Sequence, residues 1–139
     1  NTNVAQANLS ENNHKYTLRG FHYQIAPFGE SKTMTIIKGR IHDIIIDLRE
    51  DSSTYLQWIS FDLSPDQRTS FHVPAGCANA FLTMEDNTLV HYYSSFPFTE
   101  NAEKGIRYND TFFNFDWPVK EPKHISDKDN NWPDFKLIR

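Results

Sequence analysis

The amino-acid sequence predicts an all-β fold, either a sandwich or a barrel. Stretches rich in β-branched and aromatic residues follow one another closely, at residues 16–25, 32–38, 40–48, 55–63, 69–73, 78–84 and 88–94. Clusters of Pro, Gly, Asn, Asp and Ser separate these stretches and mark turns. Helical periodicity is absent until residues 126–131, where Ser126 and Asp129 can begin one short helical turn. Many short strands with turns between them are typical of β-sandwiches and β-barrels.

The remaining segments are expected to be irregular, and one strand has an ambiguous pattern. Residues 1–14 are polar and are predicted to form a loop, and residues 96–123 contain three prolines and are predicted to be irregular. In residues 40–48, one face carries Ile41, Asp43, Ile45 and Asp47, and the other carries His42, Ile44, Ile46 and Leu48. The second face is the better core candidate, with His42 as a packed or edge histidine rather than a ligand.

Length and composition indicate one domain, spanning residues 1–139. The one cysteine, Cys77, excludes an internal disulfide and fits a reducing compartment. No apolar run approaches the length of a membrane span, and the first residues are polar. The net charge of −4 is scattered along the chain, which argues against a nucleic-acid surface. We therefore expect a cytoplasmic protein that binds neither nucleic acid nor membrane.

The densest polar and aromatic cluster within a predicted strand is Arg19-Gly20-Phe21-His22-Tyr23-Gln24. In a regular strand Arg19 and His22 would point to opposite faces. A bulge at Gly20 would let both side chains line one cavity. Taken alone, the segment favours a surface arginine and a hydrogen-bonded core histidine.

Other chemically active residues also have ordinary structural explanations. Lys32 is either an edge lysine that reaches water or a cation that faces a cavity. Tyr92 is either a core tyrosine or a cavity-lining one, and solvent exposure is the default for residues 127–129. The six histidines form no H-x-H or H-x-x-x-H pair, and a single cysteine cannot build a thiolate site, so no metal is expected.

Taken together, these segments resemble the dTDP-4-dehydrorhamnose 3,5-epimerase family. The most specific pieces are Leu18-Arg19-Gly20-Phe21-His22-Tyr23-Gln24 and Ser126-Asp127-Lys128-Asp129, and further matches run through nearly the whole chain: 6–10, Lys32, 47–52, 73–81, Tyr92, 105–110 and 116–118. The resemblance implies a cupin-type jelly-roll β-barrel that acts as a homodimer, without cofactor or metal. It implies epimerisation at C3, C5 or both of a nucleoside diphosphate 4-keto-6-deoxy sugar.

The resemblance also implies a role for each matching residue. His22 corresponds to the general base, Asp129 to its carboxylate partner, Tyr92 to the general acid and Lys32 to the cation near the C4 oxygen. Arg19 corresponds to a diphosphate contact, and further substrate-binding positions are Gln6, Asn8, Asn79, Glu103 and Lys128. These residue types suit the chemistry, because a neutral histidine can remove a proton beside a ketone and a lysine charge can stabilise the enolate that forms.

The sequence departs from the family pattern at three places. The family has a longer segment before Gln6, which supplies strands and a nucleotide contact to the neighbouring subunit; these strands are absent from this chain. Where the family has His-Gly-Phe, this chain has Asn79-Ala80-Phe81, and asparagine cannot carry a proton at neutral pH. Phe96-Pro97-Phe98 stands where the family often has a tyrosine that covers the sugar.

These departures leave two alternatives to epimerisation. A 3,4-ketoisomerase would share the early enolisation but return the proton to a different atom. A sugar-nucleotide binding protein on a cupin scaffold would bind the same ligand without proton exchange, since a fold alone does not fix a function.

Overall fold

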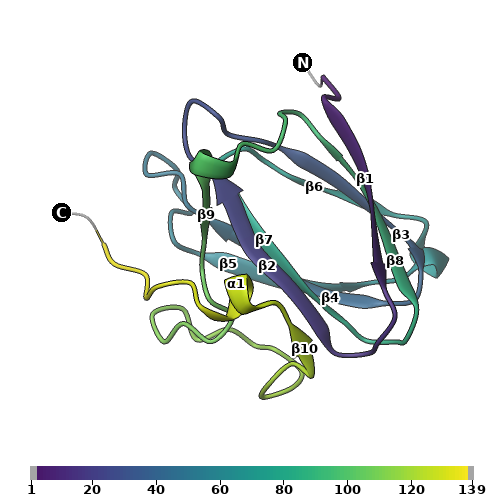
Figure 1. Ribbon diagram of the computed structural model, residues 1–139. Coiled ribbons are helices and arrows are strands. Elements are labelled where there is room, and N and C mark those ends of the chain that lie inside the picture. The colour runs from purple at the N-terminus through teal and green to yellow at the C-terminus, as the bar shows by residue number, and fades with distance from the viewer. Residues whose placement is uncertain (1–2, 138–139) are drawn as a thin grey trace.

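The computed structural model describes residues 3–137, which form two β-sheets facing each other (Figure 1). One sheet has the strand order β1-β8-β3-β6, and the other has the order β10-β2-β7-β4-β5, with β9 also paired to β2. The strands are β1 (Gln6–Asn12), β2 (Thr17–Gln24), β3 (Lys32–Lys38), β4 (Ile41–Asp47), β5 (Trp58–Leu63), β6 (Ser70–Val73), β7 (Cys77–Thr83), β8 (Thr88–Ser94), β9 (Glu103–Gly105) and β10 (His124–Ile125).

Short helices complete the fold: η1 (Pro65–Gln67), η2 (Glu100–Ala102) and α1 (Asp127–Asn130). The prediction of an all-β barrel with one C-terminal helical turn is confirmed, and so are all seven predicted strands within a few residues. Ser126 caps α1 as expected, because its hydroxyl oxygen accepts a hydrogen bond from the backbone N–H of Asp129 (3.1 Å). Within residues 3–137, no helix is both long and apolar enough to cross a bilayer.

The first core lies between the two sheets. Met34, Ile36 and Val90 from the smaller sheet pack against Ile41 and Phe81 from the larger one. These residues fill one end of the space, and the opposite end is left for polar side chains. The two sheets therefore enclose both this apolar core and a cavity that polar side chains border.

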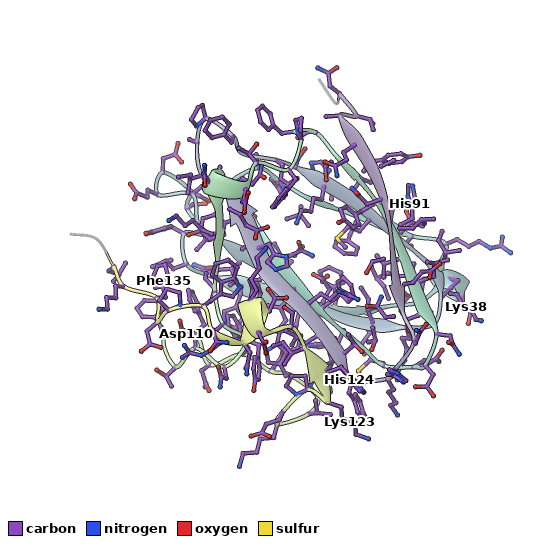
Figure 2. The ribbon with its side chains drawn as sticks, in the orientation of Figure 1. Lys38, His91, Asp110, Lys123, His124 and Phe135 are labelled. Atoms are coloured by element: carbon purple, nitrogen blue, oxygen red, sulfur yellow. The ribbon has the colours of Figure 1, made fainter. Side chains whose placement is uncertain are left out.

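A second core covers the outer face of the larger sheet. Phe21, Ile44 and Ile46 point to this face and contact Phe113 and Phe115, which belong to the irregular segment after β9. The C-terminal stretch continues across the same face (Figure 1). Figure 2 shows Asp110 beside Phe135 there, where the Asp110 carboxylate accepts a hydrogen bond from the backbone N–H of Phe135 (2.8 Å).

This second core corrects the expectation that only one face of residues 40–48 is buried. Ile44 and Ile46 lie in the second core, but Ile41 and Asp43 are also fully buried, because they point between the sheets. The larger sheet is thus covered on both faces. His42 is a packed histidine as predicted: it is 8% exposed, and its ring nitrogens lie 2.6 Å from Asp62 and 3.3 Å from Asp116.

The prediction of a loop over residues 1–14 is wrong. Residues 6–12 form β1, which pairs with β8 along its whole length. Gln6, Asn8 and Ser10 are half-buried while their neighbours are exposed. This strand carries polar residues on its inner face because it borders the polar cavity, and a polar inner face hides the usual alternation of apolar and polar residues.

The prediction of an irregular segment over residues 96–123 is correct for most of its length. The exceptions are η2 and β9, which pairs with β2 and places Gly105 opposite His22. Both elements lie beside the strand that carries the densest polar cluster.

Candidate active site

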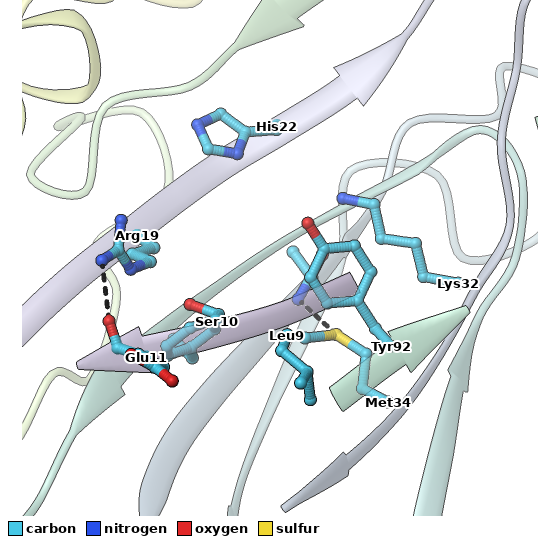
Figure 3. Close-up of a pocket in the computed structure, with 10 residues that line it drawn as sticks. Leu9, Ser10, Glu11, Arg19, His22, Lys32, Met34 and Tyr92 are labelled. Atoms are coloured by element: carbon cyan, nitrogen blue, oxygen red, sulfur yellow. Dashed lines mark hydrogen bonds between the residues drawn. The ribbon is translucent and has the colours of Figure 1, made fainter. Parts of the chain in front are cut away.

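A cavity of about 350 Å³ lies between the two sheets (Figure 3). Five strands contribute its walls. The lining residues are Leu9, Ser10 and Glu11 from β1, Arg19 and His22 from β2, Lys32 and Met34 from β3, Asn79 and Phe81 from β7, and Tyr92 from β8. Cavities that mix apolar walls with a few convergent polar groups are typical binding sites for small molecules.

Gly20 lets two residues of β2 face this cavity together. The register between β2 and β7 shifts between Gly20 and His22, so the predicted bulge is present and both Arg19 and His22 line the cavity. Gly20 has φ +110°, and a Cβ there would lie 2.6 Å from the carbonyl oxygen of Asn79. Only glycine fits both the backbone angle and the close approach.

His22 and Asp129 form a close pair at one wall of the cavity. The His22 Nε2 atom lies 2.5 Å from Asp129 Oδ1, and the carboxylate is 4% exposed. Asp129 Oδ2 accepts a hydrogen bond from the backbone N–H of Gly20 (3.1 Å). Because Nε2 is committed to the carboxylate, Nδ1 of the neutral ring keeps the lone pair that a base needs.

The electrostatics of this pair favour an ionised carboxylate. Burial acts to raise the pKa of Asp129, but the hydrogen bonds from His22, Gly20 and Trp132 together with the His22 charge outweigh it, and the pKa is lowered. A carboxylate that stays charged stabilises a protonated imidazole beside it. The pair is therefore suited to accept a proton through His22.

Lys32 and Tyr92 lie on the other wall, on adjacent strands of the smaller sheet. Figure 3 shows the Lys32 ammonium and the Tyr92 hydroxyl pointing into the space that His22 faces. Lys32 Nζ lies 3.7 Å from Glu30 Oε1 and 6.0 Å from the centre of the Tyr92 ring. Burial and the neighbouring Glu30 raise the pKa of Tyr92, so its hydroxyl keeps its proton at neutral pH.

The predicted substrate-binding residues fall into two groups around the cavity. Arg19 lines the cavity directly; its Nε donates to Asn12 Oδ1 (2.5 Å). Gln6 and Asn8 lie on the same face of β1 as the cavity-lining Ser10, and the Gln6 amide donates to Asn8 Oδ1 (3.1 Å). In the pairing of β1 with β8, Asn8 lies opposite Tyr92 and Gln6 opposite Ser94.

The second group is Glu103 and Lys128, which form a rim beside the strand that carries His22. The Lys128 ammonium pairs with the Glu103 carboxylate and lies 5.7 Å from the centre of the exposed Phe98 ring. Asn79 lies deeper, on β7, where it lines the cavity and is 5% exposed. Five of the ten predicted residues line the cavity, Asp129 contacts one of them, and the other four lie on β1, β9 and α1, elements beside the cavity-lining strands: Gln6, Asn8, Glu103 and Lys128.

Two further residues contact this site and were not predicted. Asp43 is fully buried and accepts a hydrogen bond from the Asn79 amide (3.3 Å between Nδ2 and Oδ2). Trp132 donates its indole N–H to Asp129 Oδ1 (3.2 Å). The alternation of apolar and acidic residues in 41–47 was a signal for Asp43, but no sequence pattern indicates where the Trp132 ring lies.

Comparisons with known proteins find one family that this chain resembles over nearly its whole length. A family model described as dTDP-4-dehydrorhamnose 3,5-epimerase matches residues 1–136. A dTDP-4-dehydrorhamnose 3,5-epimerase of Sinorhizobium fredii is 31% identical over 94% of this chain and 70% of its own length. The enzyme of that name from Methanothermobacter thermautotrophicus is 35% identical over 83% of this chain, which spans 63% of that relative.

Solved structures show the same likeness in three dimensions. The crystal structure of dTDP-4-dehydrorhamnose 3,5-epimerase from Bacillus anthracis, with TDP and PPi bound, has a TM-score of 0.93 and 34% identity over 96% of this chain and 76% of its own. ChmJ, a 3′-monoepimerase from Streptomyces bikiniensis in complex with dTDP-quinovose, has a TM-score of 0.87 and 29% identity over 94% of this chain and 66% of its own. By its sequence and its jelly-roll fold, this chain belongs to the dTDP-4-dehydrorhamnose 3,5-epimerase family of isomerases.

Proposed function

We propose that this chain, acting as a single domain, epimerises a nucleoside diphosphate 4-keto-6-deoxy sugar at C3, C5 or both. The observation that carries the proposal is the placement of His22 with Asp129 on one wall of the cavity and Lys32 with Tyr92 on the other. A carbon beside a ketone can be inverted when one group removes its proton and another returns one from the opposite side.

The proposed reaction begins at the unprotonated Nδ1 of His22. This atom removes a proton from the carbon beside the C4 ketone, and the electron pair of the broken C–H bond moves onto the C4 oxygen. The Lys32 ammonium stabilises the resulting enolate charge. Asp129 stabilises the imidazolium, since its carboxylate remains ionised and holds Nε2.

The second half of the reaction returns a proton from the other wall. The Tyr92 hydroxyl protonates the carbon on the face opposite His22, which inverts the centre and leaves a tyrosinate. Solvent then protonates the tyrosinate and takes the proton from His22. The raised pKa of Tyr92 keeps the hydroxyl protonated before the step and makes the tyrosinate a short-lived species.

Deuterium wash-in tests the proposal. The protein is incubated in heavy water with dTDP-4-keto-6-deoxyglucose and with matching sugars on other nucleotides, and NMR and mass spectrometry follow C3 and C5. Exchange with inversion supports epimerisation, whereas a 3-keto product indicates a ketoisomerase. Binding without exchange on any nucleotide rejects catalysis. His22→Ala should lower exchange by at least about a hundredfold, while His72→Ala, at an exposed histidine of β6, should not.

We further propose that the chain functions as a homodimer in the cytoplasm. The outer face of the smaller sheet supports a dimer, because Ile37 and Tyr93 are exposed there by 52 and 44%. The single cysteine fits a reducing compartment. Analytical ultracentrifugation tests the dimer: a monomer at all concentrations would reject it, and Ile37→Lys should weaken the association of a dimer built on this face.

A further inference from the structure

Asp129 Oδ1 accepts hydrogen bonds from two donors, one on each side. His22 Nε2 lies 2.5 Å away, and the indole N–H of Trp132 lies 3.2 Å away. The His22 and Trp132 rings meet edge to face, with 6.3 Å between their centres and 70° between their planes. Trp132 does not line the cavity, so it can affect the reaction only through its neighbours: Asp129, which accepts its hydrogen bond, and His22 and Lys128, which its ring faces.

The glycine at position 105, which has no side chain, leaves room for the Trp132 indole. Gly105 lies opposite His22 in the pairing of β2 with β9. A Cβ at Gly105 would lie 2.0 to 2.4 Å from three atoms of the Trp132 ring, so any larger residue there would displace the indole. Residues paired across antiparallel strands share a face, and the ring therefore covers the strand just where the imidazole emerges.

The backbone around Trp132 is held by a separate contact. Arg107 Nη1 donates to the carbonyl oxygen of Trp132 (2.8 Å), and Arg107 Nη2 pairs with Asp134 (2.6 Å). The indole is thus fixed from both ends, by Gly105 below its ring and by Arg107 at its main chain. A donor held in this way can keep the carboxylate in one orientation without reorganising during a reaction.

We propose that Trp132 is a positioning residue for the His22–Asp129 pair, holding the carboxylate by its indole N–H so that it stays aligned with the imidazole. The inference rests on the proposed function. A neutral donor stays protonated at every pH, so the bond does not depend on the state of His22.

The test replaces Trp132 by phenylalanine, which keeps a ring and removes the donor. Trp117→Phe is the matched control, because Trp117 also loses one indole bond, to the carbonyl oxygen of Tyr108 (2.9 Å), away from the pair. We expect Trp132→Phe to lower kcat about tenfold, the order expected for losing a hydrogen bond to a charged group. KM should change less than kcat, because Trp132 does not line the cavity and the phenylalanine keeps a ring facing Lys128.

NMR of nitrogen-15-labelled His22 without substrate gives a second readout that a purely structural role would not move. The charged groups facing the pair are Arg19 and Lys32 in the cavity and Glu103 and Lys128 at the rim, and the variant keeps all of them. The nitrogen-15 shifts of Nδ1 and Nε2 report which nitrogen carries the proton, and in Trp132→Phe they should move toward a mixture of the two tautomers because the carboxylate is no longer held toward Nε2.

A second variant, Gly105→Ala, displaces the indole by steric contact and should change kcat and the nitrogen-15 shifts in the same direction. The inference is overturned if Trp132→Phe matches Trp117→Phe in both kcat and the nitrogen-15 shifts of His22. If the unmodified protein shows no deuterium exchange, the proposed function fails, and the nitrogen-15 shifts still decide the role of Trp132.

Discussion

Asn79 donates its side-chain amide to the carboxylate of Asp43, across two neighbouring strands of the larger sheet (3.3 Å). Asp43 is fully buried, and its other oxygen, Oδ1, has no hydrogen-bond partner within the described chain. Burial raises the pKa of Asp43 well above the ordinary value for aspartate, and the Asn79 bond and the Lys32 charge offset only part of this effect. In the folded protein the Asp43 carboxyl group beneath the cavity therefore keeps its proton to a higher pH than an ordinary aspartate does.

The first prediction concerns stability against pH for Asp43→Asn. Above about pH 4 the unfolded chain ionises Asp43 while the folded chain keeps the proton, so the native protein loses stability as pH rises toward its folded pKa. Asp43→Asn has no carboxyl group at this position, so its stability does not fall with rising pH for this reason. Its free energy of unfolding, relative to the unmodified protein, should rise by about 1.4 kcal/mol per pH unit in that window.

Urea unfolding at pH 4 to 8 measures this difference. Asp66→Asn is the control for removing one acidic residue, because Asp66 is exposed on η1. Parallel stability curves for the unmodified protein and Asp43→Asn would show that Asp43 is ionised in the fold.

The second prediction separates proton removal from proton return. Tyr92→Phe keeps His22 and Asp129 and should still wash deuterium into the sugar with retained configuration, while inverted product falls by at least about a hundredfold. Tyr93→Phe is the matched control, since Tyr93 is the next residue on β8 but faces outward and is 44% exposed. Full inversion by Tyr92→Phe would mean that another group supplies the proton.

The third prediction tests the charge that faces the ketone. Lys32→Met removes a half-buried ammonium and should slow deuterium wash-in by about a hundredfold, because the enolate loses its electrostatic partner. Lys38→Met, at the exposed end of the same strand, should leave the rate unchanged. Wash-in rates under single-turnover conditions make the comparison, and equal rates for both variants would remove Lys32 from the mechanism.

The fourth prediction concerns the bulge in β2. Gly20→Ala should lower the free energy of unfolding by at least about 2 kcal/mol, because the new Cβ would lie 2.6 Å from the Asn79 carbonyl oxygen at a φ of +110°. Gly29→Ala is the control, since its Cβ would meet Ala75 at an ordinary 3.6 Å. Thermal unfolding measures both, and equal losses would show that the backbone at Gly20 can relax.

The sequence predicts those parts of this fold that follow a regular pattern. Strands β3 and β8 agree residue for residue with expectation because both are rich in β-branched and aromatic residues and are bounded by turn residues. The strand β1 escapes prediction because its inner residues face a polar cavity. The burial of both faces of β4 also escapes, since the covering residues lie far away, around Phe113 and Phe115.

The candidate site likewise contains residues that the sequence predicts and residues that it does not. His22, Lys32, Tyr92 and Asp129 could be named from the family resemblance, and the bulge at Gly20 from the glycine itself. Asp43 and Trp132 could not be assigned, because their importance depends on contacts with Asn79 and Asp129 that no local pattern encodes. Long-range packing decides these contacts, and a single sequence does not reveal it.

The cavity draws its proposed base from one sheet and its proposed acid from the other. The gap between His22 and Tyr92 is therefore set by how thickly the apolar layer fills the barrel, through residues such as Met34 and Phe81. Which carbon the proposed reaction inverts would then depend on the packing of the core. Exchanging a core methionine for a larger or smaller side chain would tune which of two carbons can be reached from both sides, without altering any group that handles a proton.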